Sequence, residues 1–321
     1  MLVRLVKDWQ KDDDLLHQTI AHSGEWNGVK FTLEAVSECD VVVFLNRVKH
    51  DEQITCRKGG RWLLQMEPPT PAHAWYRRSD REVDHVIGPE KARYGVTSER
   101  THGALPWHLN KSYDFLKELK PKEDPPNLVS MITSNANWMA GHDLRNAIVK
   151  RQQCGELRFD LFGRGYNPIE DKFDALFPYR YSIVVENSFC PNYWTEKIAD
   201  CLLSWTVPVY MGATNIDQFF PEGSFIQVDP DVDSLKEVLT DLDQDNYQGR
   251  LLAIAKAREM ILDKYQLFPF LSERVLNSKL ENSPYRTYQL KGNRAPWEGG
   301  TLSLSRKIQY QWRKLINKKP Y

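Results

Sequence analysis

Short apolar runs alternate with amphipathic stretches along most of this 321-residue chain. The clearest alternation lies in residues 181–230, where the pattern predicts strand, loop, helix, strand, loop, helix and strand in turn. The three apolar runs predicted to be strands are 181–186, 207–212 and 224–228. Strands that alternate with helices are typical of parallel βαβ units, so the pattern predicts an α/β fold.

The helix between the first two of these strands brings reactive side chains together. Asn192 is predicted to cap it, because an Asn oxygen can accept a free backbone N–H of the first turn. At about 100° per residue, Tyr193, Glu196 and Lys197 share one face within that turn. A helix start after the carboxyl edge of a parallel strand is where α/β proteins bind phosphorylated ligands. By pattern alone, a solvated polar face is the more ordinary interpretation.

A polar segment divides the chain. Residues 117–127 carry three prolines and have no apolar periodicity beyond Leu119. We therefore expect a first domain at 1–120, a linker at 121–127 and a second domain at 128–285, followed by a C-terminal segment at 286–321.

Other runs complete the predicted elements. Further strands are expected at 1–8, 28–33, 39–46, 61–66, 85–88, 128–133 and 159–163. Helices are expected at 11–22, 142–151, 233–243, 247–265 and 268–280.

The C-terminal residues 304–321 combine an apolar face with a basic one. Leu304, Ile308, Trp312 and Leu315 share a helical face, and six Lys and Arg but no acidic residue lie in this segment. Such a helix is typical of peripheral contact with an anionic membrane surface. Docking on the protein's own surface is the alternative.

The composition bears on the partners and the compartment of the protein. Lys plus Arg and Asp plus Glu number 43 each, so bulk charge gives no argument for nucleic acid. Five scattered cysteines without C-x-x-C indicate neither a disulfide framework nor a zinc site, and a reducing compartment is the simplest interpretation. With no apolar run long enough for a signal peptide or a membrane span, we expect a cytoplasmic protein, or one peripheral on the inner face of a membrane.

Residues 186–226 resemble the signature of the α-1,3/4-fucosyltransferases of glycosyltransferase family 10. The matching letters are E-N-S, Y-x-T-E-K, V-P-V-x-x-G-A and F-x-P-x-G-S-F-I, in that order. One departure is Val184-Val185, where the family usually has an aromatic residue. The resemblance implies the GT-B fold, in which two Rossmann-like domains face each other across a cleft, the first binding the acceptor and the second GDP-fucose. Eukaryotic members carry a membrane anchor, so we expect a bacterial-type enzyme rather than a truncated one.

The resemblance also implies which residues bind the donor. Lys197 is expected to neutralise phosphate, Glu196 to accept from sugar hydroxyls, and Arg145 to contact the diphosphate from a helix that follows a polar loop. An ordinary surface Arg is the alternative for Arg145. Lys172 and Arg180 fit the family pattern more weakly. The full predicted donor set is Arg145, Glu186, Asn187, Tyr193, Glu196 and Lys197.

Glu67 is the candidate general base. It ends a buried-type strand, and Pro68-Pro69 hold the following loop away from helix. An inverting transfer needs a carboxylate that takes the proton of the acceptor hydroxyl while the diphosphate leaves from the opposite face. An incidental loop carboxylate is the alternative. His73, His85 and His108 are expected near the acceptor side as packed or surface residues rather than ligands.

We therefore expect inverting transfer of L-fucose from GDP-β-L-fucose to a hydroxyl of a glycan acceptor, O3 of GlcNAc or glucose. No cluster of Asp, His or Cys has metal-ligand spacing, and the family transfers without metal, so no metal or cofactor is expected. Two alternatives stay open. One is a GT-B transferase that uses another nucleotide sugar, and the other is a non-catalytic two-lobed protein that binds a sugar or nucleotide.

Overall fold

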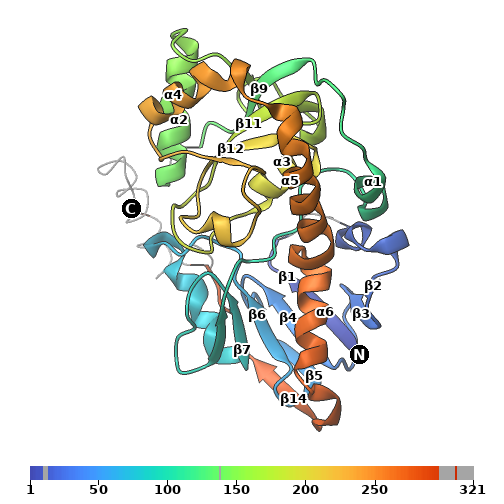
Figure 1. The fold of residues 1–321 in the computed structure, drawn as a ribbon. Coiled ribbons are helices and arrows are strands. Elements are labelled where there is room, and N and C mark those ends of the chain that lie inside the picture. Colours follow the sequence, from blue (N-terminus) through green and yellow to red (C-terminus); the bar gives the residue numbers. More distant parts are fainter. Residues whose placement is uncertain (10–13, 137–138, 296–307, 309–321) are drawn as a thin grey trace. The chain divides into compact units, whose positions relative to one another are not determined.

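The computed structural model describes residues 1–9, 14–136, 139–295 and 308 (Figure 1). It divides into two units. The first unit holds Met1–Ala104 and Leu267–Tyr321, and the second holds Leu105–Gln266.

The first unit is built on a seven-stranded sheet. All neighbouring strands run parallel except β2 and β3, which are antiparallel. β4 is buried at all five positions, as expected of a central strand covered on both faces. The spatial order is β2 (Glu25–Trp26), β3 (Val29–Thr32), β1 (Leu2–Lys7), β4 (Val41–Leu45), β6 (Arg61–Leu64), β7 (His85–Gly88) and β8 (Thr97–Arg100).

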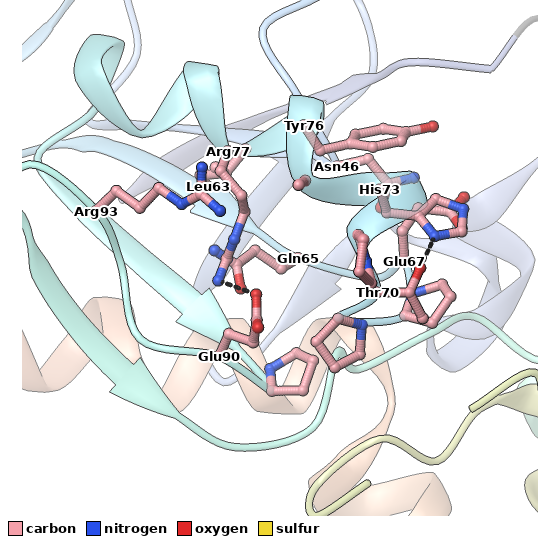
Figure 2. A pocket seen from close by; sticks show the side chains of 15 residues that line it. Asn46, Leu63, Gln65, Glu67, Thr70, His73, Tyr76, Arg77, Glu90 and Arg93 are labelled. Atoms are coloured by element: carbon pink, nitrogen blue, oxygen red, sulfur yellow. Dashed lines mark hydrogen bonds and ion pairs between the residues drawn. The ribbon is translucent and has the colours of Figure 1, made fainter. Parts of the chain in front are cut away.

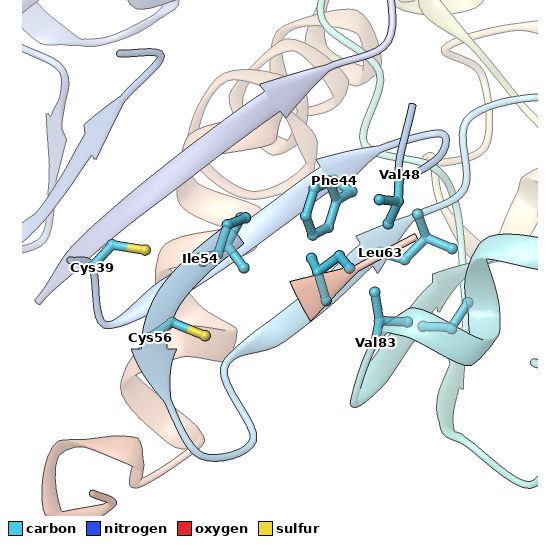
Figure 3. Close-up of a cluster of buried hydrophobic side chains, with 10 residues drawn as sticks. Cys39, Phe44, Val48, Ile54, Cys56, Leu63 and Val83 are labelled. Atoms are coloured by element: carbon cyan, nitrogen blue, oxygen red, sulfur yellow. The ribbon is translucent and has the colours of Figure 1, made fainter. Parts of the chain in front are cut away.

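A two-stranded antiparallel ribbon was not predicted. It pairs β5 (Glu52–Arg57) with β14 (Tyr285–Leu290), which are far apart in the sequence (Figure 1). Ile54 of β5 and Leu290 of β14 are buried in a core cluster together with Phe44 and Leu63 (Figure 3). Both strands of the ribbon are mostly polar, so their apolar signal is weak.

The second unit contains a five-stranded, wholly parallel sheet. Its spatial order is β10 (Asp160–Phe162), β9 (Asn127–Ile132), β11 (Tyr179–Val185), β12 (Val207–Met211) and β13 (Ile226–Gln227). After β9 the chain adds β10 on one side of this strand, and it then crosses back to add β11 on the other side. The winding direction therefore reverses between β9 and β11. This reversal matters because open α/β sheets bind ligands beyond the carboxyl ends of the strands at such a point.

The helices of the second unit follow the predicted pattern. The strands expected at 181–186, 207–212 and 224–228 are confirmed, as are the helices expected near 142–151, 233–243 and 247–265. These helices are α2 (Ala140–Gln153), α4 (Val232–Asp241) and α5 (Tyr247–Met260), and the helix after β11 is α3 (Glu196–Leu203).

The division into units differs from the predicted boundaries of 1–120, 121–127 and 128–285 in two places. α1 (Tyr113–Glu118) belongs to the second unit, where Trp205 Nε1 donates to the carbonyl of Leu119 at 2.9 Å. α6 (Leu267–Asn277) belongs to the first unit, where Arg274 pairs with Glu99 at 2.5 Å. Local composition cannot show which unit the apolar face of a helix covers.

The prediction of a helix at 11–22 is wrong for the residues of this segment that the structure describes, 14–22. Leu15–Gln18 and Ile20–His22 are short 3-10 turns, and Ala21 has a positive φ. The predicted tail helix at 304–321 lies outside the described residues apart from Ile308. Among the residues that the structure describes, no helix is long and apolar enough to cross a membrane. The predicted α/β class with two Rossmann-like sheets is confirmed.

Candidate functional site

The carboxyl ends of β9 and β11 are brought together with the start of α2. Glu186 and Asn187 directly follow β11, and Gly141 lies in the first turn of α2. A Cβ at Gly141 would collide with the backbone carbonyl oxygen of Glu186. Only glycine therefore lets the helix start approach the strand end so closely.

Arg145 lies one helical turn beyond Gly141 and is 7% exposed. Its Nε donates to the carbonyl of Gly141 at 3.1 Å, and its Nη2 donates to the side-chain oxygen of Asn187. Burial lowers the pKa of Arg145 from its usual value, although nearby carboxylates oppose this. Among the described residues no carboxylate forms an ion pair with Arg145, so a buried cation is available to an anionic ligand.

Glu186 is completely buried and connects β11 to α3. Its carboxylate accepts from the backbone N–H of Thr195 at 2.8 Å, from the Thr195 hydroxyl, and from Lys197 Nζ at 3.3 Å. Burial raises the pKa of Glu186, and the charge of Lys197 opposes this increase. Glu186 thus lies in the predicted site, but its contacts position Thr195 and Lys197.

The N-cap of α3 is Thr195, and the prediction of Asn192 is wrong. The Thr195 hydroxyl accepts from the N–H of Lys197 at 3.3 Å. Asn192 instead has φ of 66° and exchanges hydrogen bonds with Asn215. Both residue types cap helices well, and the bonds of Glu186 to Thr195 select the later start. Tyr193 therefore precedes the helix, buried at 4% exposure, and does not share a helical face with Glu196 and Lys197.

Lys197 and Glu196 form the centre of a charged cluster at this helix start. Lys197 Nζ lies 3.3 Å from Glu196 Oε1, and Lys172 Nζ lies 3.8 Å from the same oxygen. His108 Nδ1 is 3.6 Å from it. Burial works to raise the pKa of Glu196, but the charges of Lys197, His108 and Lys172 outweigh it and hold this pKa well below its usual range. Glu196 therefore stays a carboxylate, able to accept hydrogen bonds.

Asp200 and His108 were not predicted to belong to this cluster. Asp200, one turn after Glu196, holds Lys172 at 2.7 Å and accepts from the backbone N–H of His108 at 2.9 Å. The i, i+4 spacing of Glu196 and Asp200 was the available signal. His108 had been assigned to the acceptor side, but it lies in the second unit. Arg180 is not part of the cluster, because it pairs with Asp124 at the amino end of β11.

His142 also lies in this positive environment and was overlooked. It is 6% exposed. Burial, together with the charges of Arg145 and Lys197, lowers its pKa to about 4. Its imidazole is therefore neutral near pH 7.

Glu67 lines a pocket of about 390 Å³ in the first unit (Figure 2). Glu67 Oε2 lies 3.5 Å from His73 Nε2, and His73 Nδ1 lies 2.8 Å from the hydroxyl of Thr70. Burial lowers the pKa of His73 to about 4. The Thr70 hydroxyl can donate to Nδ1 of this neutral ring, which leaves a proton on Nε2 facing Glu67. The 38% exposed Glu67 side chain is thus oriented on one side and accessible on the other.

Among the described residues, no group of three or more His, Cys, Asp and Glu side chains is arranged to hold a metal ion.

Comparison with known proteins gives one family and several relatives. Residues 123–250 match the model of glycosyltransferase family 10 (fucosyltransferase), C-terminal part. The human 4-galactosyl-N-acetylglucosaminide 3-alpha-L-fucosyltransferase FUT6 is 28% identical over 218 residues, which cover 64% of this chain and 56% of that protein. Human 3-galactosyl-N-acetylglucosaminide 4-alpha-L-fucosyltransferase FUT3 is 34% identical over 148 residues, 43% of this chain and 40% of that protein. The chain thus spans about half the length of the curated relatives it matches.

Solved structures resemble the fold. An alpha-glucosyltransferase in complex with UDP-glucose and DNA superimposes with a TM-score of 0.50 at 10% identity, covering 87% of this chain and 99% of that one. A crystal structure of alpha1,3-fucosyltransferase has a TM-score of 0.49 at 16% identity and covers 83% of this chain and 90% of that one. At such low identity, the first likeness shows a similar fold alone.

Proposed function

We propose, from the match of residues 123–250 to the model of glycosyltransferase family 10 (fucosyltransferase), that the protein transfers L-fucose from GDP-β-L-fucose to a hydroxyl of a glycan acceptor, with inversion at the anomeric carbon. The observation that carries the proposal is the cation cluster at the carboxyl edge of β9 and β11. Arg145 is buried there without a carboxylate partner among the described residues, next to Lys197. A diphosphate is the group that this arrangement suits.

The donor is held by charge in this proposal. Arg145 and Lys197 contact the diphosphate and stabilise the negative charge that develops as GDP leaves. Glu196, kept ionised by its cations, accepts from hydroxyl groups of the donor. Asn187 orients Arg145, Glu186 orients Lys197, and Tyr193 packs at the same helix start. We assign no metal to the reaction, because these cations supply the positive charge that a divalent ion supplies elsewhere.

Glu67 serves as the general base of the proposed reaction. The acceptor oxygen attacks the anomeric carbon, the bond to the diphosphate breaks on the opposite face, and the hydroxyl proton moves to the Glu67 carboxylate. The neutral His73 ring donates to that carboxylate and keeps it oriented. We assign O3 of a GlcNAc or glucose unit as the attacking oxygen.

GDP release measured with GDP-fucose and with GDP-mannose tests the proposal. Lactose, N-acetyllactosamine and free GlcNAc serve as acceptors, and the product linkage is determined by NMR. Fucosylated product from GDP-fucose alone is expected. Turnover of the mannose donor only would assign another nucleotide sugar, and tight GDP binding without product from any acceptor would indicate a binding protein.

A further inference from the structure

The surface of the first unit between residues 77 and 95 is basic. The chain as a whole has 43 basic and 43 acidic residues, but every exposed charged side chain of this stretch is basic. Each acidic side chain here is buried or half-buried and has a hydrogen-bond or ion-pair partner. The basic patch consists of the exposed residues Arg78, Arg81, Lys91 and Arg93.

Two arginines of the basic patch come from the 3-10 helix η3 (Pro71–Glu82). Side chains three residues apart eclipse each other in a 3-10 helix, so η3 carries three columns of side chains. Arg78 and Arg81 belong to one column, and both are exposed. Neither guanidinium forms an ion pair with a residue that the structure describes, so both charges are available to a partner.

A second column of η3 holds the loop at 89–95. Arg77 pairs with Glu90 at 2.5 Å (Figure 2), and Asp80 accepts from the backbone N–H of Arg93 at 2.9 Å. Arg77 and Asp80 are both buried. These attachments fix the loop along the helix, so its two basic residues lie beside the arginine column.

Tyr94 adds an aromatic ring to the basic patch. It is 51% exposed, and the guanidinium of Arg81 lies 4.2 Å from the centre of its ring. Its φ of 62° is a left-handed conformation that bulky residues rarely adopt. Such backbone strain persists where the surroundings impose it, and it gathers at binding sites.

The third column of η3 binds the segment that leads to the C-terminus. Asn293 Nδ2 donates to the hydroxyl of Ser79 at 3.2 Å, and the backbone N–H of Lys291 donates to Glu82 at 3.0 Å. Residues 304–321, whose sequence combines an apolar face with six basic residues, therefore follow a segment that η3 fixes close to the basic patch.

We propose that the basic patch and Tyr94 form a contact surface for an anionic phospholipid membrane. Lipid headgroups spread negative charge over a plane, which suits cations supplied by a helix and by the loop beside it. Tyr rings are favoured at the boundary between headgroups and lipid tails. The neighbouring C-terminal segment favours a membrane over a soluble polyanion, because a polyanion offers nothing to an apolar face. This inference goes beyond the proposed function, and its test needs neither donor nor acceptor.

Flotation of the full chain with vesicles tests the proposal. We expect binding to vesicles of phosphatidylcholine and phosphatidylserine, weakened by salt, and much weaker binding to phosphatidylcholine alone. Each basic residue at such a surface changes partitioning about 5-fold, so Arg78→Gln, Arg81→Gln and Lys91→Gln together should lower it roughly 100-fold. Arg93 is left in place because it also lines the pocket of Glu67.

The matched control removes the same charge elsewhere. Lys150→Gln, Lys236→Gln and Lys256→Gln, at exposed positions of α2, α4 and α5, change the net charge equally and should leave partitioning unchanged.

Arg81 also supports Tyr94, so the melting temperature of the patch variant is compared with that of the parent protein. If the triple variant does not fold, Arg78→Gln with Lys91→Gln breaks no ion pair among the described residues. This pair should lower partitioning roughly 25-fold.

Equal vesicle binding by the patch variant and the parent protein overturns the proposal. An equal loss in both triple variants also overturns it, because bulk charge would then explain the binding. Binding of the parent protein to heparin, without binding to anionic vesicles, would assign the patch to a soluble polyanion instead.

Discussion

The carboxylate of Glu186 accepts hydrogen bonds from both the backbone N–H and the hydroxyl of Thr195, each at 2.8 Å. Through these bonds the end of β11 determines where α3 begins. Lys197, two residues later, is thereby placed beside the same carboxylate. A fully buried acid thus acts by positioning a cation.

Removing either donor-site cation is expected to weaken GDP binding. Charge-assisted hydrogen bonds contribute about 1.5–3 kcal/mol, so Arg145→Ala and Lys197→Ala should each lower affinity roughly 10- to 150-fold. Calorimetric titration with GDP measures this. Arg180→Ala, which breaks an exposed ion pair at the other end of β11, is the control and should bind GDP normally. Unchanged affinity in both site variants contradicts the diphosphate assignment.

Glu67→Gln should reduce turnover without reducing donor affinity. A general base contributes about 10²–10⁴-fold to the rate, and Gln keeps the shape of Glu but cannot take the proton. Steady-state kinetics together with GDP-fucose titration provides both values. Glu90→Gln, in the same pocket, should lose far less turnover. If Glu67→Gln remains active, another residue acts as the general base. Glu186 is a poor candidate for that role, because it has no exposed surface.

Transfer is expected to persist in EDTA. Arg145 and Lys197 carry the positive charge required at the diphosphate, so removal of divalent ions should leave kcat/KM nearly unchanged. GDP release with and without EDTA is the measurement. Complete loss of activity that manganese restores would reject the metal-free proposal.

Stability should decrease as the pH falls from about 6.5 to 4. His73 stays neutral in the folded state to a pKa of about 4, whereas the unfolded chain protonates near 6.5. The unfolded state therefore binds more protons in this window, and at pH 5 one such His costs about 2 kcal/mol. Melting temperatures at pH 7 and pH 5 should differ less in His73→Gln than in the parent protein. An equal difference in both would show that His73 does not titrate in this way.

The C-terminal segment is expected to bind anionic membranes. Its apolar face and six basic residues should hold the protein on vesicles that contain phosphatidylserine. Deleting residues 302–321 should abolish cosedimentation with these vesicles and leave turnover of soluble acceptors intact. A deletion that unfolds the protein supports docking of this segment on the protein instead.

Local pattern was sufficient for most strands and for part of the site. The apolar runs at 181–186 and 207–212 correspond to β11 and β12. They could be recognised because a parallel strand buried on both faces appears in the sequence as a short, continuous apolar run. The same reasoning placed Glu196 and Lys197 at a helix start after a strand, and the structure has them there. These features depend on neighbours within a few residues.

Features that depend on partners distant in the sequence were decided by the tertiary structure. Asn192 and Thr195 can both cap a helix locally, and the contact with Glu186 selects Thr195. His108 and Lys172 reach Glu196 from segments far along the chain. The helix α6 has an apolar face that suits either unit, and its packing on β2 and β3 assigns it to the first. Sequence periodicity by itself determined which apolar runs become buried strands, whereas through-space contacts determined the partners of the polar side chains in the site.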